Sequence, residues 1–157
     1  MKRRNLWLER VWSQPGFLKP YEHPPREFPY YVDFEPTNLC NFTCIMCNRE
    51  TMGRGQGRMT LETHKRLIDE MAGYAHLGVG VRYLRHGEPA LHVDLPEMIA
   101  YARSKGVLTY ISTNGFNLDQ VGDKLLDAGL DYLRVSIQGI DFRSFTEIRD
   151  KEFSGKY

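Results

Sequence analysis

The sequence predicts an α/β fold, namely a partial (β/α) barrel of parallel strands with about four βα units. Short segments rich in β-branched and aromatic residues alternate along the chain with segments of about ten residues or more in which apolar side chains recur at helical spacing. Strands that alternate with helices of this length form βαβ units and a parallel sheet. In this class, ligands bind at the carboxyl ends of the strands.

The first βα unit begins near Tyr30. In residues 30–35 the apolar side chains alternate, and Pro36 ends the predicted strand. The helix of this unit is expected over about residues 60–74, where apolar side chains recur at helical spacing. Thr60 precedes the first apolar residue and is the expected N-cap.

Three further units repeat this pattern. Strands are expected at residues 79–84, 107–113 and 132–137, and the helices that follow them begin at Asp94, Leu118 and Asp141. Asp94 and Glu97 have the spacing of a capping box. Gly106 and Gly129 follow the second and third helices and are expected to stop them.

Residues 1–29 differ in composition from the rest of the chain. Five prolines alternate there with aromatic residues, and prolines at this density exclude a continuous helix or a central strand. We expect a leader whose aromatic side chains pack on the domain formed by residues 30–157; the alternative is that they contact a substrate. The domain is expected to be truncated at its C-terminus, because a complete eight-unit barrel usually takes roughly 250 residues.

Composition indicates a globular domain in solution. The chain has 157 residues, of which 41% are hydrophobic and 26% charged, so it can bury a core. A net charge of +1 gives no reason to expect nucleic acid or an anionic membrane as a partner. No segment is apolar and long enough to cross a bilayer, and the charged N-terminus does not have the form of a signal peptide. We expect a cytoplasmic location, which suits reduced thiols.

All three cysteines lie within eight residues, at Cys40, Cys44 and Cys47. Their odd number excludes a fully paired disulfide framework, and their density is typical of thiolate ligands to zinc or to iron in iron–sulfur clusters. Three ligands are one fewer than a closed structural site takes from protein, so one coordination position stays open. The alternative is a zinc site completed by a histidine such as His64 or His86.

Polar and glycine residues collect where the other predicted strands end. These stretches are Arg85-His86-Gly87-Glu88-Pro89, Ser112-Thr113-Asn114-Gly115 and Ser136-Ile137-Gln138-Gly139. Because the carboxyl ends of parallel strands meet at one edge of a sheet, we expect these residues to line one site with the cysteines. Taken alone, Thr-Asn-Gly is a common turn sequence.

The cysteine spacing and the three strand-end motifs, in this order, resemble those of radical S-adenosylmethionine (radical SAM) enzymes, and in particular their SPASM- and twitch-type members. The resemblance covers residues 30–157. It implies a 4Fe-4S cluster whose fourth iron is left for S-adenosylmethionine (SAM), with three cysteine ligands: Cys40, Cys44 and Cys47. It implies that SAM is bound by Gly87, Glu88, Pro89, Ser112, Asn114 and Ser136.

By this resemblance the chain is an enzyme, or the N-terminal part of one. It would cleave SAM reductively to methionine and a 5′-deoxyadenosyl radical, which removes a hydrogen atom from a substrate that the sequence does not identify. A reductant such as flavodoxin or ferredoxin is an implied partner, and a longer chain or a second chain would supply the rest of the barrel. The alternative function is a non-catalytic zinc- or cluster-binding interaction module.

Other polar residues have weaker signals. His86 stands where the family usually has the first glycine of Gly-Gly-Glu-Pro, and it would be strained if that position required a positive φ; alone it is read as a loop residue. His64 and His92 are predicted to be surface or capping residues. The glycines of residues 53–57 are predicted to form a flexible link. A last group is expected either to reach a carboxylate across the barrel mouth or to be solvated or paired: Arg82, Arg85 and Arg134.

Overall fold

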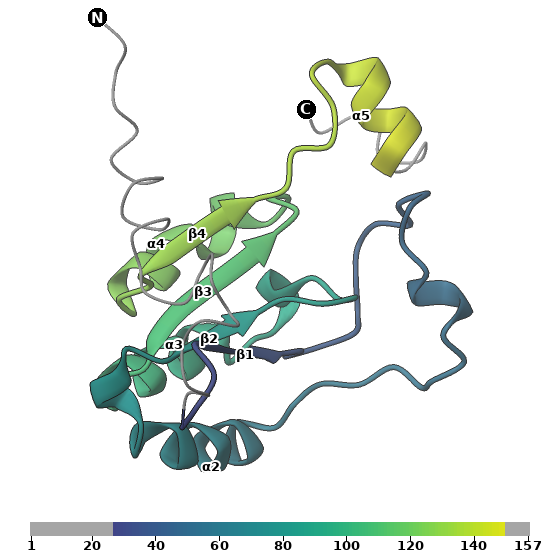
Figure 1. The fold of residues 1–157 in the computed structure, drawn as a ribbon. Helices are drawn as coiled ribbons and strands as arrows, with labels where there is room; N and C mark the ends of the chain where they lie inside the picture. The colour runs from purple at the N-terminus through teal and green to yellow at the C-terminus, as the bar shows by residue number, and fades with distance from the viewer. Residues whose placement is uncertain (1–26, 150–157) are drawn as a thin grey trace, which may run out of the picture.

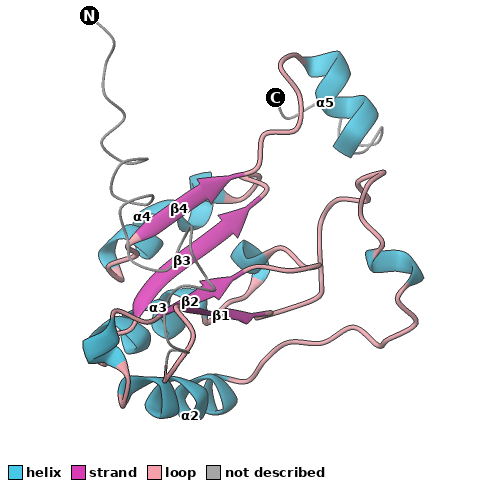
Figure 2. Ribbon diagram, in the orientation of Figure 1, coloured by secondary structure: helices cyan, strands magenta, loops and turns pink. Residues whose placement is uncertain are grey.

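Four parallel strands form a single sheet, in the order β1-β2-β3-β4, in the computed structural model, which describes residues 27–149 (Figure 1). The strands are β1 (Tyr31–Phe34), β2 (Gly80–Tyr83), β3 (Leu108–Thr113) and β4 (Tyr132–Val135). The longer helices are α2 (Leu61–Ala72), α3 (Leu95–Ser104), α4 (Leu118–Asp127) and α5 (Phe142–Arg149) (Figure 2). The predicted α/β fold with about four βα units is confirmed, because strand order follows the order of the chain as in a barrel.

Short 3-10 helices complete the connections. They are η1 (Arg49–Thr51), η2 (Ala75–Leu77) and η3 (Pro89–Leu91). None of the helices in residues 27–149 is long and apolar enough to span a membrane. Most of the predicted leader lies outside the described residues; of its aromatic side chains, Phe28 stacks on Tyr74 with the ring centroids 4.5 Å apart.

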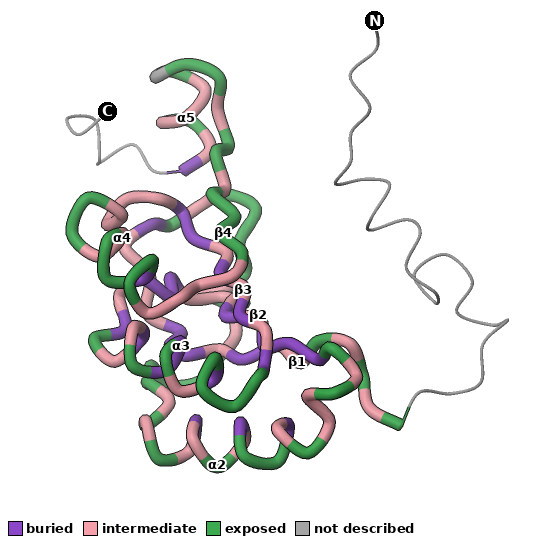
Figure 3. Tube along the Cα trace, turned by 90° about the vertical axis from the view of Figure 1, so that its left-hand side faces the viewer, coloured by how far each residue is buried: buried purple, intermediate pink, exposed green. Residues whose placement is uncertain are grey.

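The core lies between one face of the sheet and the helices α2, α3 and α4. Val81 and Tyr83 of β2 and Ile111 of β3 are fully buried on this face, where they belong to the same apolar cluster as Ile68 of α2 and Met98 of α3. Figure 3 shows the matching pattern on α2, whose buried residues lie on the side toward the sheet. Burying each large apolar side chain contributes about 1.5–3 kcal/mol, so this covered face is the main source of stability.

Alternation along the strands places a different set of side chains on the opposite face. This open face is defined by Asp33, Arg82, Tyr110, Ser112 and Arg134. Asp33, Arg82 and Tyr110 are neighbours across three strands, and Ser112 is paired in register with Arg134. The open face is therefore polar and charged.

The helices α2 and α3 begin where predicted, but only α2 has its predicted side-chain cap. The Thr60 side chain accepts a hydrogen bond from the Thr63 N–H at 3.1 Å. Asp94 is the N-cap residue of α3, but its side chain makes no capping hydrogen bond, because its backbone does not adopt the extended conformation of a capping residue. Glu97 instead forms an ion pair with Lys65 of α2 at 2.8 Å, so the predicted capping box is wrong.

His64 lies in the core, and its prediction as a surface or capping residue is wrong. Its Nε2 is 2.8 Å from the Tyr83 hydroxyl, which donates its single proton to the Met98 carbonyl at 3.3 Å. Nε2 must then carry a proton, which leaves Nδ1 as a buried acceptor with no partner among the described residues. Burial lowers the pKa of His64 from 6.5 to about 4. His64 is therefore a neutral core residue and no partner of the cysteines.

His92 is also buried, not on the surface. Its Nε2 lies 2.9 Å from the Met59 carbonyl, and its Nδ1 accepts from the Asp94 N–H at 3.2 Å. Both ring nitrogens are thus used within the fold, and His92 helps to hold the start of α3.

Candidate functional site

The cysteine loop, residues 36–59, leaves β1 at the carboxyl end of the sheet and lies at the same end as α5 (Figure 1). Its three cysteines are free thiols; Cys40 and Cys44 are partly buried and Cys47 is exposed. Burial raises the pKa of the Cys40 thiol. A hydrogen bond of 2.9 Å from the Cys47 N–H to the Cys44 carbonyl forms a turn between the last two cysteines.

The two ends of the cysteine loop are tied together by Thr37 and Asn38. The Asn38 amide donates to the Gly55 carbonyl at 2.8 Å and accepts from the Gly57 N–H at 2.7 Å. The Thr37 hydroxyl donates to the Gly57 carbonyl at 2.9 Å. The glycine segment, predicted as a flexible link, is thus hydrogen-bonded to the residues that precede Cys40.

Phe42 anchors the middle of the loop. Its ring is buried and makes edge-on contacts with Phe116, at 5.6 Å between centroids, and with Phe145 of α5, at 6.0 Å. The Ile45 N–H also donates to the Ile148 carbonyl at 3.0 Å. The segment that carries the cysteines is therefore held against α5 by both side chain and backbone.

Gly87 brings the Gly-Glu-Pro segment against the start of the cysteine loop. A Cβ added at this position would lie 1.8 Å from the Thr37 carbonyl oxygen, so only glycine fits. The neighbouring Glu88 N–H donates to the Leu39 carbonyl at 2.8 Å. The Gly-Glu-Pro segment and the start of the cysteine loop, which are predicted to share one site, are therefore in direct contact.

The positive φ that was considered for His86 is found one residue earlier, at Arg85. Arg85 has a φ of 109°, the one positive value among non-glycine residues of the described chain, whereas His86 has none. The His86 N–H donates to the Glu35 carboxylate at 3.0 Å, and its ring lies 3.6 Å from the same oxygen. His86 is a half-buried loop residue tied to the end of β1.

Glu88 is buried, with 3% of its surface exposed, and joins the ends of β2 and β3. Its carboxylate accepts from the Thr113 hydroxyl at 2.6 Å, from the Asn114 N–H at 2.7 Å and from the Ala90 N–H at 3.0 Å. Burial raises the pKa of Glu88, and these hydrogen bonds oppose the increase. A carboxylate can accept about four hydrogen bonds, so Oε2 retains one acceptor position.

Asn114 connects this carboxylate network to the cysteine loop. Its amide donates to Asn41 Oδ1 at 2.8 Å, and its own Oδ1 accepts from the Phe116 N–H at 2.9 Å. These bonds fix which end of the Asn41 amide is oxygen. The Asn41 Nδ2 is then buried, and it has no hydrogen-bond partner in the part of the chain that the structure describes.

Leaving a buried N–H without a partner costs about 1–3 kcal/mol of folding stability. A group that accepts a hydrogen bond from the Asn41 amide, next to Cys40, would remove this cost. The sulfur atoms of a thiolate-bound cluster are acceptors of this kind, and the residues present therefore fit such a group. Within residues 27–149, no three His, Cys, Asp or Glu side chains are placed to hold a single metal ion. In a cluster, however, each cysteine binds a different iron, and the thiols need not meet at one point.

Arg149 at the end of α5 is a further candidate site residue, and it was not predicted from the sequence. It is buried, its Nη1 lies 3.6 Å from Cys44 Sγ, and its Nη2 donates to the Ser136 carbonyl. Its guanidinium carbon lies 5.5 Å from the centre of the Phe42 ring. The available signal was its spacing: Arg149 follows Phe145 by four residues and so lies on the same face of the helix.

The hydroxyls of Ser112 and Ser136 are 3.5 Å apart at the ends of β3 and β4. They face a polar cavity of about 370 Å³ on the open face. Its lining is formed by Arg82, Leu84, Arg85, His86, Tyr110, Ser112, Arg134 and Ser136. The predicted strand-end residues therefore line one end of the sheet, with the serines on the cavity side and Glu88 and Asn114 buried beneath the cysteine loop.

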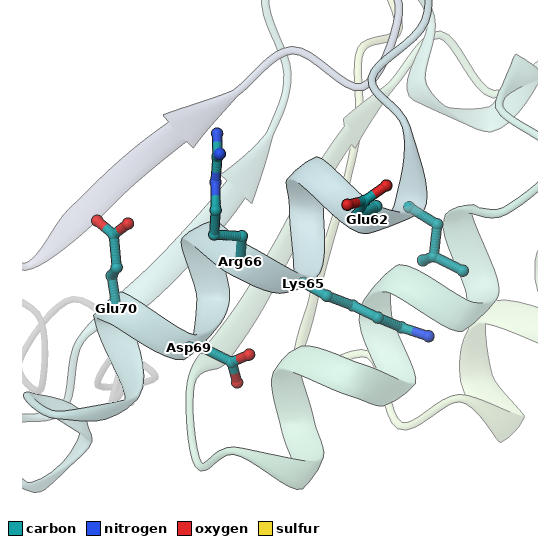
Figure 4. Close-up of a pocket in the computed structure, with 6 residues that line it drawn as sticks. Glu62, Lys65, Arg66, Asp69 and Glu70 are labelled. Atoms are coloured by element: carbon teal, nitrogen blue, oxygen red, sulfur yellow. The ribbon is translucent and has the colours of Figure 1, made fainter.

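A larger hollow lies along α2 and is not part of this site. It is lined only by residues 61–70, and Figure 4 shows its labelled side chains projecting from that one helix. Two of its charges are paired with α3 and the residue after it, Lys65 with Glu97 at 2.8 Å and Asp69 with Lys105 at 2.6 Å. This arrangement is a solvated helix surface.

Comparison of the sequence with known proteins identifies the family to which the chain is similar. The model of the radical SAM superfamily matches residues 34–154. Fe-coproporphyrin III synthase of Methanosarcina barkeri is 39% identical over 111 residues, which are 69% of this chain and 27% of that protein. GTP 3′,8-cyclase of Chlorobaculum tepidum is 34% identical over 126 residues, which are 78% of this chain and 37% of that protein. The chain thus spans about a third of the length of these curated relatives.

A solved structure agrees in fold. The crystal structure of BtrN in complex with AdoMet and 2-DOIA superposes with a TM-score of 0.64, covering 71% of this chain and 46% of that one. The two sequences are 21% identical, so this likeness concerns the fold alone.

Proposed function

The chain belongs to the radical SAM superfamily, whose members bind a 4Fe-4S cluster and SAM, and we propose that it binds both at the carboxyl end of its sheet. When bound, the cluster supplies an electron that cleaves SAM to methionine and a 5′-deoxyadenosyl radical, which removes a hydrogen atom from a substrate. The protein's own part is to hold, orient and shield these groups. The observation that carries the proposal is the chain of hydrogen bonds Glu88–Asn114–Asn41, which joins three separate motifs into one site.

In this proposal three cysteines are the cluster ligands: Cys40, Cys44 and Cys47. Two neighbouring groups support a negatively charged cluster at this position. Asn41 offers a buried N–H without a partner, and Arg149 places a buried cation 3.6 Å from Cys44 Sγ. A cation at this distance offsets part of the negative charge that a thiolate-bound cluster carries.

SAM would be bound by the strand-end residues. Glu88 has one acceptor position left for the ammonium group of SAM, and the tight contact of Gly87 with Thr37 keeps the Gly87–Pro89 segment beside the cysteines. Ser112 and Ser136 face the cavity and can both donate and accept, which suits a carboxylate or ribose. Asn114 uses both ends of its amide within the protein, so its contribution would be to position Asn41 and the Glu88 carboxylate.

Further strands are expected to cover β4. All four of its residues are exposed, including Leu133 at 47% and Val135 at 38%, whereas Val81 and Tyr83 of β2 are fully buried. An exposed strand edge with apolar side chains is a site for strand pairing. We propose that a longer chain or a second chain supplies the missing strands, and that a reductant such as flavodoxin or ferredoxin delivers the electron.

Anaerobic reconstitution with iron and sulfide tests the proposal. The wild type is expected to gain a broad visible absorption band that bleaches with dithionite, and to form 5′-deoxyadenosine when SAM and dithionite are added. Cys44→Ala should lose both, while Asn48→Ala, an exposed change in the same loop, should keep both. A colourless wild type that binds one zinc ion per chain would instead support an interaction module.

A further inference from the structure

The open face gathers three arginines around the cavity of about 370 Å³ that also contains the two serines. Arg82 of β2 and Arg85 after it share one carboxylate. Arg82 Nε lies 2.6 Å from one oxygen of Asp33, and Arg85 Nη2 lies 2.7 Å from the other. Both oxygens of Asp33 are therefore engaged, and the pair of arginines already exceeds the charge of its partner.

Glu35 does not supply the missing negative charge. It follows β1, and its carboxylate accepts from Arg54 at 2.7 Å and from the His86 N–H at 3.0 Å. Arg54 is a residue of the cysteine loop and does not line the cavity. The Glu35 carboxylate is thus paired with Arg54, a cation outside the cavity.

The backbone of Arg134 in β4 pairs with β3, but its guanidinium forms no hydrogen bond or ion pair within the described range 27–149. It lies in register beside Ser112, on the same face of the sheet as Arg82. The lining of the cavity holds three guanidinium groups and no carboxylate, and the nearby Asp33 balances one of them. The cavity therefore has an excess of positive charge, with Arg134 as the group that has no partner.

A solvated arginine on an outer surface would need no explanation, but this position differs. Parallel strands in chain order curve into a barrel with this face inward, so the strands proposed to cover β4 would enclose Arg134, which is exposed in the described structure. A guanidinium taken out of water without a partner is costly, so an enclosed Arg134 requires an anion.

We propose that the substrate of this enzyme carries a carboxylate or phosphate group that Arg134 binds in this cavity. The inference rests on the proposed function, because it names the substrate class of the same site. The fork of N–H groups on a guanidinium matches two oxygens of either anion. The serine hydroxyls connect this position with the end of the sheet where SAM is expected.

Calorimetric titration of the reconstituted, SAM-saturated protein with inorganic pyrophosphate or citrate tests the inference. The wild type should bind at least one of the two anions. Arg134→Gln should weaken that binding tenfold or more, and Arg134→Lys should restore part of it by restoring the charge. Arg66→Gln is the matched control, because Arg66 is exposed on α2 and its loss removes the same charge. Cluster content and SAM affinity should be the same in all four proteins.

Three results would overturn the inference. The first is that Arg134→Gln and the wild type bind the anions equally well, or that a wild type that binds SAM binds neither anion. The proposed binding of cluster and SAM would then stand, but the substrate would not be assigned as an anion. In the second, Arg134→Gln loses affinity for SAM but not for decarboxylated SAM, which assigns the arginine to the carboxylate of SAM itself. In the third, the wild type binds no SAM, and the proposed function fails together with the inference.

Discussion

The two faces of the sheet are built from the same strands but differ in the side chains that they present and in what those side chains do. On β2, Val81 and Tyr83 point to the helices and are fully buried, while Arg82 between them points to the open face with 40% of its side chain exposed. On β3, Ile111 and Ser112 are neighbours with the same contrast. The covered face is apolar and stabilises the fold, whereas the open face and the strand ends hold polar groups that do not all find partners within residues 27–149.

This comparison predicts that neighbouring residues of one strand have separable effects. Ile111→Ala leaves a cavity in the core and should lower the free energy of unfolding by about 2–5 kcal/mol. Ser112→Ala, one residue later, removes a hydroxyl at the cavity and should change stability by less than about 1 kcal/mol while weakening SAM binding. Thermal unfolding and SAM titration of the two variants measure both effects, and a large loss of stability in Ser112→Ala would contradict the division between the faces.

Gly87 lies at the boundary between the two regions, and its replacement should affect both. The Cβ of Gly87→Ala would overlap the Thr37 carbonyl, so we expect a loss of about 3 kcal/mol in stability together with poor cluster retention. Gly55→Ala is the control, because a Cβ there meets no atom within 4 Å. Denaturant unfolding and iron content would show the difference; equal behaviour of the two variants would mean that the Gly87 contact is not needed.

His64 gives the covered face a pH dependence. Its folded pKa of about 4 lies below the ordinary 6.5, so the unfolded chain binds a proton more readily between these values. Stability from this residue is fully present above pH 6.5 and is lost as the pH falls toward 4, by about 3 kcal/mol. The melting temperature of the wild type should therefore fall more steeply over this range than that of His64→Leu. His76→Leu, a change at an exposed histidine, should keep the wild-type slope.

Asn41 lies in the cysteine loop, which follows β1. Its replacement should change the reduction potential of the cluster rather than the stability of the fold. Asn41→Asp still accepts from Asn114 but loses the N–H that we place against the cluster, so the reduction potential should become more negative, by roughly 1 kcal/mol of driving force. Asn48→Asp adds the same charge at an exposed position of the loop and should shift the potential less. A redox titration followed by electron paramagnetic resonance compares them, and equal shifts would leave charge alone as the cause.

Local patterns explain what the sequence could predict. Alternation and helical spacing are short-range, so the four strands and four α-helices of residues 27–149 were placed to within a few residues, while the three short 3-10 helices were not predicted. The strand-end motifs followed from topology. His64 was misplaced because its residue type outweighed its position, three residues after Leu61 and four before Ile68 on the buried side of α2. The predicted capping box failed because Glu97 has a partner on another helix.

Contacts between residues far apart in the chain could not be predicted from the sequence. The Asn114–Asn41 hydrogen bond joins residues 73 positions apart, and the contact of Arg149 with Cys44 joins residues 105 apart. No spacing rule encodes either of them. The role of Glu88 was also only partly visible: the motif indicates a SAM ligand, while the structure shows a carboxylate that already joins two strand ends.

The central claim is that the cysteines and the Gly87–Pro89 segment form one site for the cluster and SAM. Its most direct test is the electron paramagnetic resonance spectrum of the reduced, reconstituted protein during titration with SAM. The account predicts a saturable change of the cluster signal, with an affinity for SAM that falls in Glu88→Gln at unchanged iron content. A signal that SAM does not alter, or one that responds equally in Glu88→Gln, would contradict it.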